Sequence, residues 1–264
     1  MRRLDLRCGW ALCLVVTGAL VGCASTPKQA QPEETREQSA AALQVQLGQQ
    51  YLINGDLEKA QDKLKRALEL DPRSVDAHTL VAVLNERIGR PEIAETHHRK
   101  ALAIKPDDGA LNNNFGVFLC GQGRYAESRT YFDKATSDPF YKTPGAAFAN
   151  AGVCARKSGD LTASETNFRR ALDLDPRNTV ALYELARVAH ERGEYLRARA
   201  FIQRYEALAP PDAALLSLAA DVESKLGDQA HAEKYRERLQ RDFPDYADPG
   251  QATEPAPSKE TSSS

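Results

Sequence analysis

Residues 47–72, LGQQYLINGDLEKAQDKLKRALELDP, contain a glycine in the middle and a proline at the end, and both recur along the chain. The apolar residues on either side of Gly55 follow a helical period, which predicts two amphipathic helices. Gly55 suits a turn between them, because a left-handed backbone conformation is costly for other residues. Pro72 ends the second helix, because proline cannot continue the helical hydrogen bonding. The segment therefore predicts a helix hairpin.

Equivalent glycines and prolines define one period through the chain. The glycines are Gly55, Gly89, Gly123, Gly159, Gly193 and Gly227. The prolines are Pro72, Pro106, Pro176, Pro210 and Pro244. Successive glycines are 34 residues apart, except that 36 residues separate Gly123 from Gly159. The two residue types give one frame of six predicted repeats, at residues 41–74, 75–108, 109–144, 145–178, 179–212 and 213–246.

A period of 34 residues resembles the tetratricopeptide repeat (TPR), in which helix A, a tight turn and helix B form each unit. The first repeat has this family's spacing at Leu47, Gly48, Tyr51, Ala60, Leu64, Ala67 and Pro72. Gln44 stands where the family often has tryptophan. Close helix crossing demands small residues at three positions of each repeat, and all but Tyr205 and Leu239 of these positions hold Gly, Ala or Ser. The resemblance predicts an all-α fold, a right-handed superhelical solenoid of six TPR helix-turn-helix repeats.

The N-terminus predicts export and lipid attachment. Arg2 and Arg3 precede an apolar run at residues 8–21, which is too short to span a bilayer as a mature helix. The run ends in Leu20-Val21-Gly22-Cys23, which resembles the bacterial lipobox. We therefore expect removal of residues 1–22 and attachment of diacylglycerol and an N-acyl chain to Cys23, which would hold the protein on a membrane. The alternative is an ordinary signal peptide with a chance cysteine at its end.

The segments that precede and follow the repeats predict the cellular location of the protein and its tethering. In lipoprotein sorting, an aspartate after the lipidated cysteine retains a protein at the inner membrane, and Ala24 occupies that place. Resemblance to sorted lipoproteins thus predicts the outer membrane, facing the periplasm. Residues 23–40 predict the anchor and a flexible tether, and residues 247–264 a disordered tail. A formal net charge of −2 and the lack of a basic cluster argue against a nucleic-acid partner.

The third repeat is irregular. Pro139 falls near the expected end of helix B, so the two extra residues lie in the connector from Phe140 to Pro144. This connector either alters the array or is a tolerated surface insertion. Cys120 and Cys154 are expected at comparable levels of neighbouring A helices, and export would place them in an oxidising compartment. A disulfide between them would stabilise the fold by about 3 to 4 kcal/mol. The alternative is two separate buried thiols.

The same region is similar to a known family. The similar segments are Asn112 to Cys120, Gly123-Arg124-Tyr125, Asp138-Pro139-Phe140-Tyr141 with Pro144, and Asn150 to Cys154. They resemble the distinctive region of the PilF/PilW family of type IV pilus biogenesis and stability lipoproteins, or pilotins, whose members also have a lipobox, a short polar tether and six repeats. The resemblance implies an outer-membrane scaffold that assists localisation and multimerisation of the pilus secretin through TPR-mediated protein binding. The alternative is another periplasmic TPR lipoprotein scaffold, for outer-membrane barrel assembly or for peptidoglycan enzymes.

A solenoid of this kind binds partners on the helix A residues that face its inner curve. The predicted binding residues are Val45, Gln49, Leu52, Thr79, Val83, Glu86, Asn113, Val117, Val153, Arg156, Tyr183, Arg187 and His190. The first two repeats offer a mildly apolar surface, suited to an amphipathic helix or an extended strand of a secretin tail, and the later repeats a more polar one. The alternative for Leu52 and Val83 is packing between neighbouring A helices.

The sequence lacks motifs for catalysis. His97 and His98 are adjacent, so on a helix they point about 100° apart and cannot share a metal as histidines four residues apart would. We expect them on a solvated face. No nucleophile motif, phosphate-binding glycine loop or metal cluster is evident. The sequence predicts a protein that is not an enzyme and has no metal, no cofactor beyond the lipid on Cys23 and no small-molecule substrate.

Overall fold

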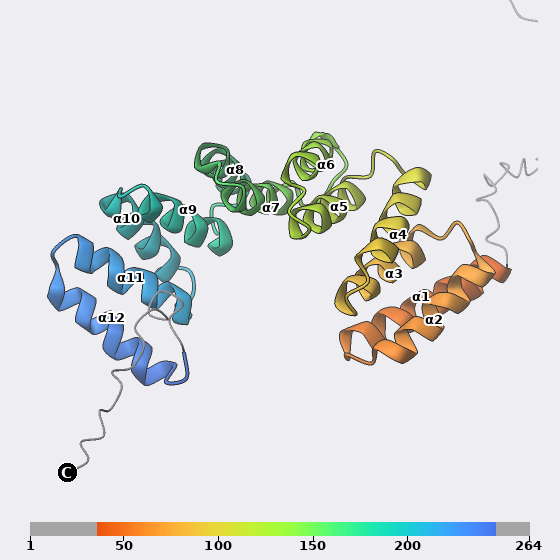
Figure 1. Ribbon diagram of the computed structural model, residues 1–264, viewed down its shortest axis with the longest axis horizontal. Helices are drawn as coiled ribbons and strands as arrows, with labels where there is room; N and C mark the ends of the chain where they lie inside the picture. Colours follow the sequence, from red (N-terminus) through yellow and green to blue (C-terminus); the bar gives the residue numbers. More distant parts are fainter. Residues whose placement is uncertain (1–35, 247–264) are drawn as a thin grey trace, which may run out of the picture.

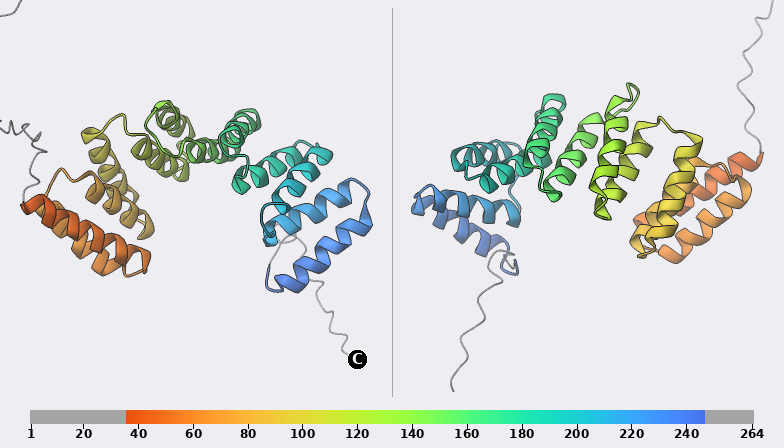
Figure 2. Two further views of the ribbon diagram at one scale, coloured as in Figure 1. Left: turned by 180° about the vertical axis from the view of Figure 1, so that it is seen from behind. Right: turned by 45° about the horizontal axis from the view of Figure 1, so that its top comes forward.

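The computed structural model describes residues 36–246, which form twelve helices and no strand. The helices are α1 (Arg36–Ile53), α2 (Leu57–Leu70), α3 (Val75–Arg87), α4 (Pro91–Ile104), α5 (Gly109–Gly121), α6 (Tyr125–Ser137), α7 (Pro144–Lys157), α8 (Leu161–Leu174), α9 (Thr179–Glu191), α10 (Tyr195–Glu206), α11 (Ala213–Lys225) and α12 (Gln229–Asp242). They pack as consecutive pairs that form an open arch, with α5, α7 and α9 on its inner side (Figure 1). Figure 2 shows the same arch from behind and tilted. The predicted all-α TPR solenoid is confirmed.

The turns between paired helices explain the regular frame. All six predicted turn glycines have positive φ, between 72° and 85°. Residues other than glycine rarely adopt this backbone conformation, so glycine recurs at each turn. The N–H groups at the start of helix B are then capped in several repeats, as where the Asp160 carboxylate accepts from Ala163 N at 2.9 Å.

The small residues of helix A lie where the paired helices cross. A Cβ atom at Gly116 would lie 2.8 Å from the Phe132 ring, and one at Gly152 would lie 2.7 Å from the Phe168 ring. Because both rings are buried and belong to helix B of the same repeat, a larger residue would push the two helices apart. The predicted requirement for small residues at these crossings is confirmed.

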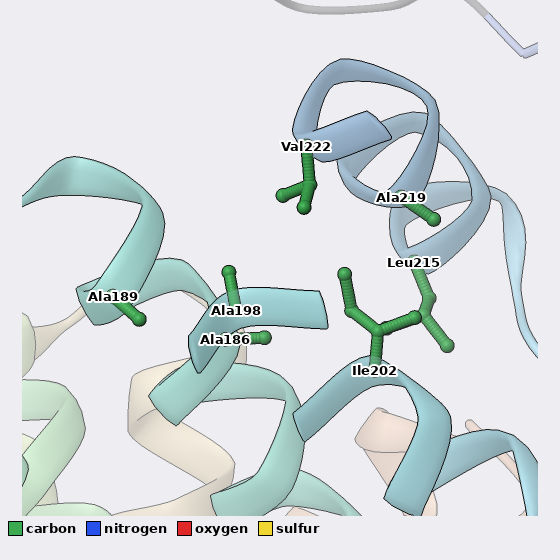
Figure 3. Packing of buried hydrophobic residues seen from close by; sticks show 7 residues of the cluster. All are labelled: Ala186, Ala189, Ala198, Ile202, Leu215, Ala219 and Val222. Atoms are coloured by element: carbon green, nitrogen blue, oxygen red, sulfur yellow. The ribbon is translucent and has the colours of Figure 1, made fainter. Parts of the chain in front are cut away.

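Neighbouring repeats are joined by thin layers of apolar side chains. Figure 3 shows one such layer in the last two repeats, built from seven buried side chains of α9, α10 and α11. They are Ala186, Ala189, Ala198, Ile202, Leu215, Ala219 and Val222. Four of the seven are alanines, which let the helices approach closely while longer side chains fill the space between repeats.

The first helix begins earlier than the sequence predicted. α1 starts at Arg36, so residues 36–40, which were expected to belong to the tether, are helical. This stretch and the alanines that follow it contain no proline or glycine, so nothing in the local sequence stops the helix. Cys23 and the predicted tail at residues 247–264 lie outside the described residues. None of the helices within residues 36–246 combines the length and the apolar character that a membrane span requires.

The third repeat contains the predicted insertion. Residues 138–143 connect α6 to α7, two residues more than the connector at residues 71–74. The connector folds back onto its own repeat, because the Asp138 Oδ2 atom accepts a hydrogen bond from Gly109 N at 2.8 Å. Tyr141 packs so closely on Gly109 that a Cβ atom there would lie 2.6 Å from Tyr141 Cβ. The insertion is therefore an ordered part of the repeat.

Candidate protein-binding surface

The first two repeats enclose a cleft of about 810 Å³ between α1 and α3. Its lining combines apolar, amide and charged side chains. The lining residues are Gln38, Ala41, Ala42, Val45, Gln46, Gln49, Asp71, Arg73, Ser74, Val75, Asp76, Thr79, Leu80 and Lys105. Three predicted binding residues, Val45, Gln49 and Thr79, are brought together there. The cleft is a recess that these three predicted residues share.

The floor and walls of the cleft differ in chemistry. Val45 is 8% exposed and packs against Ala67 and Ala77, so it forms an apolar floor. Gln49 is exposed at the wall, and the Thr79 hydroxyl donates to Val75 O at 2.9 Å. An apolar floor below polar walls suits a segment that buries a few aliphatic side chains and hydrogen-bonds along its edges.

Leu52 does not lie on this surface. It is 3% exposed and packs with Ala60, Leu64 and Leu84 inside the first two repeats. Val83 is half-buried. The prediction that Leu52 binds a partner on the inner surface was wrong, because its side chain points from α1 toward α2 and α3. The alternative, packing between helices, describes it.

Glu86 and the histidines form a second polar group. The Glu86 carboxylate lies 2.8 Å from His98 Nε2, and His98 is 3% exposed against the rings of Phe115 and Phe118. The expectation of a solvated face for His98 is therefore wrong. His97 is also partly buried, with its Nδ1 atom 3.0 Å from His78 Nδ1.

His78, which no sequence motif singled out, sets the hydrogen bonding of this pair. The Pro72 carbonyl can only accept, so His78 Nε2, at 3.1 Å from it, is the donor. In its neutral form, His78 then accepts from His97 through Nδ1. Burial and the neighbouring His78 lower the pKa of His97 to about 4, and burial lowers the pKa of His78. Both rings are therefore neutral at pH 7.

In the later repeats, two of the predicted binding residues bridge neighbouring helices and a third makes a contact within its own helix. Asn113 is 8% exposed and accepts from Asn150 Nδ2 at 3.0 Å. Arg156 donates from α7 to Glu184 of α9 at 2.8 Å. The Arg187 guanidinium lies 5.7 Å from the centre of the Tyr183 ring. The contacts of Asn113 and Arg156 join neighbouring repeats, whereas Arg187 and Tyr183 both belong to α9.

Other predicted residues in this part differ in how much they expose. Val117 is 44% exposed, and Val153 is half-buried beside the core. His190 pairs with Asp221 of the next A helix. Within the described part of the chain, the later predicted residues include members of ion pairs, whereas the cleft of the first two repeats has a mixed lining that is more polar than the mildly apolar surface the sequence predicted.

Cys120 and Cys154 form the disulfide that the sequence allowed. Their Cα atoms are 5.7 Å apart, and the bond ties α5 to α7. Phe132 packs beside it, and the Ser128 hydroxyl donates to Gly116 O at 2.7 Å. The bond therefore joins the third and fourth repeats on the side opposite to the long connector, since both cysteines are near the C-terminal end of an A helix.

Comparisons with known proteins agree with this architecture. Tetratricopeptide repeat models match residues 45–109, 150–213 and 113–137. The type IV pilus assembly protein PilF of Pseudomonas aeruginosa is 29% identical over 236 residues, which cover 89% of this chain and 93% of PilF. The crystal structure of PilW, a widely conserved type IV pilus biogenesis factor, matches this chain with a TM-score of 0.74 at 34% sequence identity. The match covers 78% of this chain and 94% of the PilW chain. The chain belongs to the PilF/PilW family.

A second member of the PilF/PilW family has a solved structure. That of Pseudomonas aeruginosa PilF matches with a TM-score of 0.72 at 29% identity, over 80% of this chain and 96% of the other. Since the likeness spans nearly the whole of each relative, it covers all six repeats and not a shared hairpin. The protein is therefore a PilF/PilW-like TPR protein of type IV pilus biogenesis.

Proposed function

We propose that this protein is an outer-membrane lipoprotein that faces the periplasm, is anchored through Cys23, and assists localisation and multimerisation of the type IV pilus secretin. Family membership carries the proposal. The lipobox ending at Cys23 supports the anchor. In this role the protein works by binding other proteins and performs no chemistry of its own.

The cleft between α1 and α3 is the proposed site for a secretin segment. Its apolar floor at Val45 takes an aliphatic side chain, and Gln49 and Thr79 offer hydrogen bonds to the segment's backbone. Arg73 and Lys105 line the cleft together with Asp71 and Asp76, so the lining attracts a segment that carries both signs of charge. The location of the cleft next to the start of α1 keeps it near the proposed anchor.

A binding measurement with matched variants tests the cleft. Gln49 lines it, whereas the neighbouring Gln50 lies outside it and hydrogen-bonds to Asn54 on the surface. Gln49→Arg should weaken binding of the secretin's purified periplasmic part at least tenfold, about 1.4 kcal/mol. Gln50→Arg adds the same charge on the same helix and should leave binding unchanged. Equal affinities for the two variants would exclude the cleft as the site.

A further inference from the structure

The long connector of the third repeat exposes an aromatic side chain. Phe140 is 89% exposed, and no other exposed large apolar side chain in residues 36–246 reaches that fraction. Burying a phenylalanine contributes roughly 1.5 to 3 kcal/mol, so full exposure forgoes that gain in the isolated protein. Its neighbour Tyr141 is half-buried on Gly109. The connector thus buries one aromatic ring and presents the next.

The backbone that carries Phe140 is held in place. The Asp138 carboxylate accepts from Phe140 N at 2.8 Å through Oδ1, and from Gly109 N at 2.8 Å through Oδ2. Tyr141 N donates to Asp138 O at 3.2 Å. Pro139 fixes its own φ directly before Phe140, and the hydrogen bonds from both sides hold the turn. One carboxylate therefore joins the presented residue to the start of α5.

The connector that carries Phe140 also carries an exposed basic side chain. Lys142 is exposed two residues after Phe140. Phe140 and Lys142 define the connector surface.

We propose that the connector surface is a second protein-docking site, at which Phe140 enters an apolar pocket with an acidic rim on a folded partner. An aromatic ring on an ordered backbone raises affinity for a pocket of matching shape, because the backbone loses little conformational freedom on binding. A fluid lipid surface gains nothing from that geometry, and a single aromatic ring gives only marginal attachment to it. Lys142 favours carboxylates at the rim of the pocket. The inference rests on the proposed function in one respect, that the partner is a protein of the pilus apparatus.

Site-specific cross-linking in cells tests this docking directly. The photoreactive residue p-benzoylphenylalanine replaces Phe140 in the full chain, and in a control it replaces Leu196, which is 70% exposed on α10. We expect a discrete adduct with one envelope protein at position 140, identified by mass spectrometry, and no equivalent adduct at position 196. Equal adducts at both positions, or an adduct only with a second copy of this chain, would overturn the proposal.

The purified partner then gives the affinity. Phe140→Ser should weaken binding about 30-fold, as expected for an interface anchor of about 2 kcal/mol, while Phe140→Leu retains most of it and Leu196→Ser changes nothing. The thermal midpoint of Phe140→Ser should match that of wild type, because the side chain makes few contacts. Unchanged affinity in Phe140→Ser refutes the proposal, as does a Phe140-dependent binding to phosphatidylethanolamine–phosphatidylglycerol vesicles without the partner. Secretin multimers in a deletion strain test the proposed function separately.

Discussion

The contact between Gly109 and the long connector predicts a large effect of adding one methyl group. In Gly109→Ala, the new Cβ atom would lie 2.6 Å from Tyr141 Cβ and 2.9 Å from Asp138 Oδ2. Neither atom is the free end of a long side chain, so the connector itself has to move. Such overpacking typically costs about 1 to 3 kcal/mol, and loss of the Asp138 hydrogen bond to Gly109 N adds to this.

A second glycine in the same helix provides the control. A Cβ atom at Gly121 would meet nothing within 4 Å, and alanine is the better helix former there. Thermal unfolding followed by circular dichroism should place the midpoint of Gly109→Ala several degrees below wild type, at roughly 2 to 4 °C for each kcal/mol. The midpoint of Gly121→Ala should equal or exceed that of wild type. If Gly109→Ala melts at the same temperature as Gly121→Ala, the ordered connector is refuted.

Three further effects follow from the packing and the charges. Replacing Cys120 and Cys154 by alanine should lower the free energy of unfolding by about 3 to 4 kcal/mol in urea titrations, and a loss under 1 kcal/mol would show that the closed loop contributes little. Phe168→Ala, which empties a fully buried site against Gly152, should cost about 3 to 5 kcal/mol in the same assay, and an effect below 1 kcal/mol would contradict the packing. The pKa of His97 falls to about 4 in the folded state, so the unfolded chain takes up the proton first as the pH drops below 6.5. The free energy of unfolding therefore decreases between pH 6.5 and 4, by at most roughly 3 kcal/mol. Thermal midpoints across that range should fall less steeply in His97→Gln, and parallel slopes would refute the assignment.

The repeated parts of the molecule were the most predictable from the sequence. Gly55 and its equivalents mark turns because positive φ is a local requirement, and Gly116 and Gly152 mark helix crossings because contact within one hairpin is nearly local too. The cysteine pair could be suggested from the same frame, since Cys120 and Cys154 both lie late in the A helices of neighbouring repeats. A period therefore fixes every contact that recurs in each repeat.

Contacts that occur in only one repeat could not be predicted from the repeat period. The carboxylate of Asp138 reaches Gly109 N, 29 residues earlier, and only the folded connector brings them together. His78 meets His97 across α3 and α4, where most repeats have other residues. Leu52 faces the interior. The sequence did not predict this, because the helical period gives the spacing of buried residues but not which side of the helix a neighbouring repeat covers.

The most direct test of the proposed role is the amount of heat-stable secretin multimer in outer membranes of a strain that lacks this protein. The deletion is complemented with wild type or with Cys23→Ala, and the expression level of each is matched. We expect multimers to disappear in the deletion strain and to return with wild type but not with Cys23→Ala. Unchanged multimers in the deletion strain would contradict the proposed role, and a scaffold for barrel assembly or for peptidoglycan enzymes would then be the better description.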